Sequence, residues 1–274
     1  MLNPSASGMT DDDPRGLPVP YATPPAAGNF TAGDLLLVDG GGGDAAALVG
    51  AYLAAGGGDI ATYTALLGTL LTADEINAAL AAGASGLASI GTTYMTALGN
   101  RAYDLLKAGA LDKGAQRVAL LNAPDITLTP RFQMVLDSVA AANGGGDAGA
   151  AARAQSQALF SSWVATFNAT LASRVAGYSR IALVDFFTEF QNQVANPAQY
   201  GLTNATTPAC PITGIGDDGL PLYTFATCTN EALDASPPAG VSGAGWYDSW
   251  VFSDGFHPTP YGHQLVSQLI SRSL

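Results

Sequence analysis

Positive charge is scarce in this chain. Its 274 residues include 10 Lys and Arg against 22 Asp and Glu, which gives a formal net charge of −12 at pH 7. So acidic a protein repels nucleic-acid phosphates and anionic membrane surfaces, and neither is expected as a main partner. No apolar run reaches the roughly 18 residues of a membrane-spanning helix, so no membrane span is expected. No basic segment followed by an apolar core marks a signal peptide at the start.

Histidine and cysteine are also rare, with two of each. A structural zinc site needs four nitrogen or sulfur ligands close together, so no metal site is expected, and nothing in the sequence calls for another cofactor. Cys210 and Cys228 lie in a segment rich in Pro, Gly, Thr and Asp. A disulfide between them would stabilise the fold by about 3 kcal/mol in the chain-entropy view and would imply an oxidising compartment. Two unpaired thiols are the alternative.

Hydrophobic residues make up 48% of the chain and charged residues only 12%, the composition of a globular protein with a large core. Short apolar runs, typical of buried strands, alternate with longer helical patterns. The runs are residues 35–38, 117–121 and 180–185, with a shorter candidate strand at 247–252; the helical patterns cover 45–55, 73–82, 85–108, 130–142, 150–176 and 186–195, with one more after residue 260.

This alternation predicts an α/β fold with a parallel sheet and helices on both faces. We expect a single domain over residues 1–274. Within it, residues 1–33 are polar, proline-punctuated and loop-rich, and residues 197–245 form a long connection. A connection of that length in a compact domain is usually functional or stapled, here by Cys210 and Cys228 if they pair.

A glycine-rich turn, Asp39 to Asp44, follows the first apolar run. It lacks the Lys-Ser/Thr of a P-loop and the Gly-x-Gly-x-x-Gly dinucleotide pattern, which argues against a phosphate-binding loop. The alternative is a backbone that approaches a substrate closely at the carboxyl end of a strand, where open α/β sheets place their ligands.

Both histidines lie within residues 253–263, in Ser-Asp-Gly-Phe-His-Pro-Thr-Pro-Tyr-Gly-His. On a loop before a helix, the carboxylate of Asp254 can hold one imidazole nitrogen of His257 and leave the other to take a proton from a nucleophile. The alternative is an ordinary turn and helix cap with an incidental histidine.

Asp254-Gly255-Phe256-His257 resembles the C-terminal Asp-x-x-His block of the SGNH or GDSL hydrolases, a family of serine esterases and lipases. Gly41-Gly42-Gly43-Asp44 resembles their Gly-x-Asn-Asp block, and Gly8 resembles their oxyanion glycine. The resemblance implies a three-layer α/β/α sandwich of the flavodoxin-like type. It also implies a carboxylic-ester hydrolase acting on a small-molecule or lipid ester, with catalytic His257 and Asp254 and substrate contacts at Gly8, Gly43 and Asp44. The segment from Tyr200 to Cys210 is similar to the long loop of secreted members, which implies a secreted, cell-surface or periplasmic protein.

Two family features are missing from this sequence. No Gly-Asp-Ser nucleophile block is present, and Gly43 replaces the asparagine that donates to the oxyanion. Ser5, Ser7 and Ser85 do not replace the nucleophile, because none follows a strand in the required Gly-x-Ser-x-Gly turn. We therefore expect that the first strand is missing, that an N-terminal segment carries the serine, and that this chain alone is weakly active or inactive. The alternative is an inactive relative that binds ligands or serves as a passenger domain.

Overall fold

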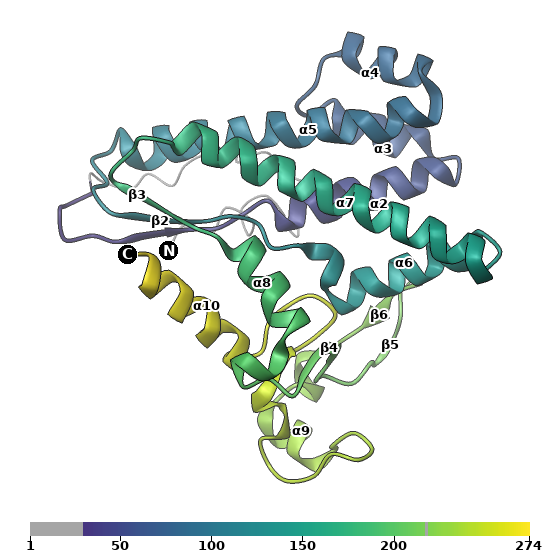
Figure 1. Cartoon of the computed structure of the whole chain (residues 1–274), viewed down its shortest axis with the longest axis vertical. Helices are drawn as coiled ribbons and strands as arrows, with labels where there is room; N and C mark the ends of the chain where they lie inside the picture. The colour runs from purple at the N-terminus through teal and green to yellow at the C-terminus, as the bar shows by residue number, and fades with distance from the viewer. Residues whose placement is uncertain (1–29, 217–218) are drawn as a thin grey trace. The chain divides into compact units, whose positions relative to one another are not determined.

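The computed structural model describes residues 30–216 and 219–274 (Figure 1). Gly8, Ser5 and Ser7 lie outside the described residues, as does most of the loop expected over residues 1–33. The chain divides into two compact units. The first comprises Leu159–Phe187, Ser273–Leu274 and the described part of Met1–Pro124, and the second comprises Asp125–Ala158 and Thr188–Arg272.

A three-stranded sheet organises the first unit. Strands β1 (Leu36–Val38), β2 (Val118–Leu121) and β3 (Ile181–Val184) pair in this order, and both pairings are parallel. Every residue of β2 is buried, as its unbroken apolar sequence predicts. The predicted parallel sheet and its three strands are therefore confirmed, whereas the three-layer sandwich stays a prediction.

Strand β3 is less buried than its apolar sequence predicts. Only Val184 is buried, and 37% of the Leu183 surface is exposed. Among the described residues β3 pairs with β2 alone, so it forms an edge of this sheet, where side chains have fewer neighbours. An apolar run shows that a strand forms, but its position in the sheet determines the burial.

Helices of the first unit follow the predicted pattern with one addition. Helices α2 (Gly42–Gly56), α4 (Ala73–Ala81) and α5 (Gly83–Leu106) lie where expected, and a short π-helix, η1 (Lys107–Leu111), follows α5. Helix α3 (Ile60–Leu67) is an element that the sequence patterns missed. Its start is capped by Asp59, whose carboxylate accepts the Thr62 amide at 3.1 Å. Asp59 directly follows a run of glycines, which obscures its role as a helix cap in the sequence.

Aromatic side chains fill the core of the first unit. Helix α7 (Gly146–Val175) supplies Phe160, Trp163 and Phe167, all of them fully or almost fully buried. The Trp163 indole packs edge-on against Tyr52 of α2, with ring centroids 5.3 Å apart, and donates a hydrogen bond to the Ala88 carbonyl of α5 at 3.3 Å. The amphipathic pattern that predicted a helix over residues 150–176 therefore reflects a real buried face.

The second unit contains shorter elements. Its helices are α6 (Pro130–Ala142), the part of α7 up to Ala158, α8 (Phe186–Ala195) from Thr188 on, α9 (Asn230–Ala235) and α10 (Pro260–Ser273) up to Arg272. Its 3₁₀ turns are η2 (Ile126–Leu128), η3 (Pro197–Tyr200), η4 (Phe225–Thr227) and η5 (Trp246–Ser249). Strand β4 (Asn204–Pro208) pairs parallel with β7 (Trp250–Phe252), and β5 (Gly214–Ile215) pairs antiparallel with β6 (Pro221–Leu222). The long connection over residues 197–245 therefore contains short strands and turns. No helix in the described parts of the chain is long and apolar enough to cross a lipid bilayer.

Candidate active site

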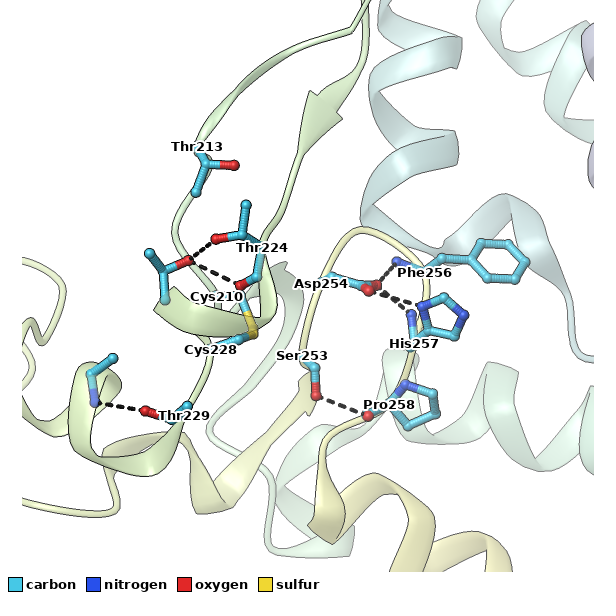
Figure 2. Close-up of a disulfide and its surroundings, with 12 residues drawn as sticks. Cys210, Thr213, Thr224, Cys228, Thr229, Ser253, Asp254, Phe256, His257 and Pro258 are labelled. Carbon is cyan, nitrogen blue, oxygen red and sulfur yellow. Dashed lines mark hydrogen bonds and ion pairs between the residues drawn. A yellow bond between two sulfur atoms is a disulfide. The ribbon is translucent and has the colours of Figure 1, made fainter. Parts of the chain in front are cut away.

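Asp254 and His257 form a hydrogen-bonded pair on the loop between β7 and α10. The His257 Nδ1 atom lies 2.8 Å from Asp254 Oδ2 (Figure 2). An ionised carboxylate only accepts hydrogen bonds, so Nδ1 carries the proton and Nε2 is left as the basic nitrogen. The imidazole is 72% exposed, whereas the Asp254 side chain is 29% exposed. The loop therefore presents a solvent-accessible base held by a more sheltered carboxylate.

Backbone hydrogen bonds hold this loop in shape. Asp254 Oδ1 accepts the amides of Phe256 and His257, each at 2.7 Å. The Ser253 amide donates to the His257 carbonyl at 2.8 Å, and its hydroxyl donates to the Pro258 carbonyl at 2.9 Å. The dyad is thus built by a closed loop of few residues. The Asp254–His257 pairing that the sequence predicted is therefore present in the folded loop.

The start of α10 anchors the other end of the loop. Thr259 is buried, and its hydroxyl donates to the Trp250 carbonyl at 2.5 Å while accepting the Gly262 amide at 3.1 Å. One side chain therefore caps the helix and fastens it to β7. The Pro-Thr-Pro sequence that predicted a turn before a helix is confirmed as this cap.

The two members of the dyad shift each other's pKa in opposite directions. The hydrogen bond to Asp254 raises the pKa of His257 above its ordinary value, although burial opposes the change. Burial alone would raise the pKa of Asp254, but hydrogen bonds from the His257 ring and from the His257 and Phe256 amides outweigh it and lower this pKa. Near neutral pH, Asp254 is therefore ionised and holds the imidazole in the orientation that a general base requires.

Asp254→Asn tests this coupling. The substitution removes the negative charge beside the imidazole, so the pKa of His257 is expected to fall. A titration of the histidine ring protons by NMR measures the change, and His263 on α10 provides an internal reference. An unchanged His257 pKa would contradict the pairing.

The disulfide predicted from the cysteines is present and lies beside the dyad loop. Cys210 and Cys228 are joined, with Cα atoms 5.1 Å apart, so the alternative of two unpaired thiols is wrong. The Cys210 amide donates to the Ser253 carbonyl at 2.7 Å, immediately before Asp254. The disulfide therefore fixes the chain that follows β4 next to the loop that carries the base.

Gly43 and Asp44, the other described site residues predicted from the sequence, belong to the first unit and lie in the first turn of α2. The turn before them depends on Gly41, which has a φ of 90°; a Cβ there would come within 2.4 Å of the Phe167 ring. That close approach to the core explains the glycine in the turn after β1 without a bound phosphate.

Asp44 is buried, and burial raises its pKa to about 6, although a hydrogen bond from its own backbone amide opposes the shift. The folded chain therefore binds this proton more tightly than the unfolded chain. The contribution of Asp44 to stability falls as the pH rises from about 4 to 6, and the full cost of the buried charge applies above pH 6.

Asp44→Asn is expected to stabilise the protein at pH 8. A pKa shift of about two units corresponds to about 3 kcal/mol of stability. Burial of the neutral but polar amide in the variant offsets part of this, so we expect a net stabilisation of about 1–2 kcal/mol. At pH 4 the gain should nearly vanish. Urea denaturation at both pH values measures it, and an equal effect at both would contradict the assignment.

Two further residues share a pocket with the dyad and were not singled out as site residues by the sequence. Arg131 lies in the first turn of α6, and Tyr223 follows β6; both line a cavity with residues 254–257. Tyr223 has apolar neighbours in the sequence, with Leu222 before it and Phe225 shortly after it. Those two neighbours are 50% and 88% exposed, so packing does not explain them. The sequence signal for Arg131 is weak, a lone cation in the helix after the turn that follows β2.

Comparison with known proteins confirms the family resemblance. The model of the family described as GDSL-like Lipase/Acylhydrolase matches residues 92–270, which is more than half of the chain and includes Asp254 and His257. Gly43 and Asp44 lie outside the matched residues. A search of curated proteins finds no match. On the family match and the Asp-x-x-His geometry together, the chain belongs to the GDSL-like lipase/acylhydrolase family.

Proposed function

We propose that this chain supplies the acid–base half of a carboxylic-ester hydrolase, with His257 as the proton carrier and Asp254 as the group that orients it. The observation that supports this most strongly is the 2.8 Å contact between His257 Nδ1 and Asp254 Oδ2 in a member of the GDSL family. Family membership supports ester hydrolysis as the class of reaction. The assignment of roles to residues is our proposal.

In the proposed reaction, His257 Nε2 takes the proton of a serine hydroxyl as its oxygen attacks the ester carbonyl. The imidazolium, stabilised by Asp254, then protonates the departing alcohol and leaves an acyl-serine. Water repeats the sequence, giving its proton to His257 and releasing the acid. On the family resemblance, we assign Gly8, Gly43 and Asp44 to oxyanion and substrate binding. The missing asparagine donor at position 43 would cost about 100- to 1000-fold in rate.

The proposed reaction also needs a nucleophilic serine, which we do not assign to any residue within 1–274. We propose that it comes from a segment with a Gly-Asp-Ser block, because no such block occurs in residues 1–274. The disulfide favours an oxidising compartment, so we also propose a secreted, cell-surface or periplasmic location.

The test is to sequence the reading frame upstream of Met1 and to assay the extended chain beside the printed chain on a short-chain chromogenic ester. We expect a Gly-Asp-Ser block upstream. The extended chain should hydrolyse the ester, and the 274-residue chain should show only trace hydrolysis. An upstream frame without the block, or a folded extended chain that hydrolyses no ester, would favour the inactive alternative and contradict the proposal.

A further inference from the structure

A small pocket in the second unit joins the dyad to a cation. It has a volume of about 100 Å³ and is lined by Arg131, Pro221, Tyr223 and residues 254–257. A water molecule occupies about 30 Å³ in the liquid, so the pocket holds a group of a few heavy atoms. It is smaller than the 300–1,000 Å³ typical of pockets for drug-sized ligands. The described residues therefore form a subsite for a short group and not for a long acyl chain.

Arg131 is fixed to the dyad loop by its backbone. Its amide donates to the Gly255 carbonyl at 2.8 Å, and the next residue, Phe132, packs its ring against Phe256 with centroids 6.2 Å apart. A Cβ on Gly255 would lie 3.2 Å from the Arg131 Cβ and 3.5 Å from the Tyr223 hydroxyl. The glycine between Asp254 and His257 therefore lets three segments close around one space.

The pocket offers hydrogen-bond donors to a ligand. A guanidinium carries five N–H donors in a planar fork, so it can serve a ligand alongside protein partners. Burial raises the pKa of Tyr223, as does the nearby Asp254 charge, while Arg131 lowers it in part. The net effect keeps the phenol protonated at neutral pH, when it can donate as well.

The carboxylate of Asp254, which also lines the pocket, already accepts hydrogen bonds from its own loop. Asp254 Oδ1 accepts two backbone amides, and Oδ2 accepts the His257 ring proton. Both carboxylate oxygens are therefore engaged within the loop. In Figure 2 the Phe256 and His257 rings point away from the disulfide. The pocket thus combines an aromatic wall and donor groups beside the proposed base.

We propose that this pocket binds a carboxylate carried by the ester substrate, so that the hydrolase acts on esters that bear a second, anionic group. Arg131 would pair with that carboxylate, Tyr223 would donate to it, and His257 would stand next to the ester bond. The proposal rests on the proposed hydrolase function and narrows its substrate class. A carboxylate matches the guanidinium fork in shape and charge, and the pocket volume suits the carboxylate end of a short half-ester.

Binding to the printed chain tests the proposal without turnover. The probes are monomethyl glutarate, which carries a carboxylate, and dimethyl glutarate, which does not. NMR signals of the His257 ring report occupancy, with assignments from a His263→Gln variant. At pH 7.5 we expect the monomethyl ester to bind at least about tenfold more tightly than the dimethyl ester, as for a charge-assisted hydrogen bond.

Arg131→Gln should remove this preference, and Tyr223→Phe should reduce it. Arg272→Gln is the matched control, because Arg272 lies in the same unit, is 62% exposed and pairs with Glu189 away from the pocket. It should leave the preference unchanged. Equal affinity for the two probes, or a carboxylate preference that survives in both pocket variants, would overturn the proposal.

The two proposals can fail separately. If the chain prefers the carboxylate probe but its extended form hydrolyses no ester, the proposed binding site stands and the proposed hydrolase function is contradicted. Hydrolysis by the extended chain without any charge preference would contradict the anionic subsite and retain the hydrolase.

Discussion

Replacing His257 by alanine in the chain that contains a Gly-Asp-Ser segment is expected to lower kcat on the order of a million-fold. Without the imidazole, no group takes the serine proton or returns one to the leaving alcohol. KM should change little, because the substrate contacts we propose lie on Arg131, Tyr223 and the oxyanion glycines. Steady-state kinetics on a short-chain chromogenic ester measure the loss.

Two further variants, one at Asp254 and one at His263, show whether that loss of kcat is specific to the dyad. Asp254→Asn should cost about ten-thousand-fold, because the base remains but its tautomer and orientation are lost. His263→Ala is the matched control, since this exposed histidine on α10 lies outside the pocket, and we expect near-normal rates. Activity of His257→Ala within tenfold of the parent would show that another base performs the reaction.

Loss of the Cys210–Cys228 disulfide is expected to lower the free energy of unfolding by about 3 kcal/mol. The bond closes a loop with a sequence separation of 18, and opening it restores conformational freedom mainly to the unfolded chain. Chemical denaturation of the Cys210→Ser, Cys228→Ser double variant measures the effect. Reductant should destabilise the parent by a similar amount and leave the double variant unchanged.

The disulfide should also affect the pocket beside the dyad. Cys210 bonds to Ser253 just before Asp254, and the stapled segment carries Pro221 and Tyr223 into the pocket. We expect the double variant to bind monomethyl glutarate more weakly while the pKa of His257 stays raised, because the Asp254 contacts lie within their own loop. A loss of stability below about 1 kcal/mol would mean that other contacts hold this segment.

The sequence predicted well the features that depend on neighbours along the chain. The strand at Val118–Leu121 is a continuous apolar run, and the Asp254–His257 pair lies on one short loop, so local pattern and chemistry sufficed for both. The Cys210–Cys228 pairing was also within reach, because the sequence has no other cysteine.

Features that depend on distant segments were harder to predict. Arg131 and Tyr223 meet residues 254–257 only through the packing of α6 and β6, which no spacing in the sequence indicates. Likewise, the exposure of Leu183 depends on the edge position of β3, and the cap at Asp59 was hidden behind glycines. A hydrogen-bonded pair on one loop can be predicted from local sequence, whereas the groups that we propose to bind the substrate come from distant parts of the chain.

The most direct test of the central claim is covalent labelling with a serine-reactive fluorophosphonate, followed by peptide mass spectrometry, on the extended chain and its His257→Ala variant. We predict an adduct on the serine of the Gly-Asp-Ser segment, and its formation should depend on His257. The 274-residue chain alone should form no adduct. An adduct on a serine within residues 1–274, or labelling that persists without His257, would contradict this prediction.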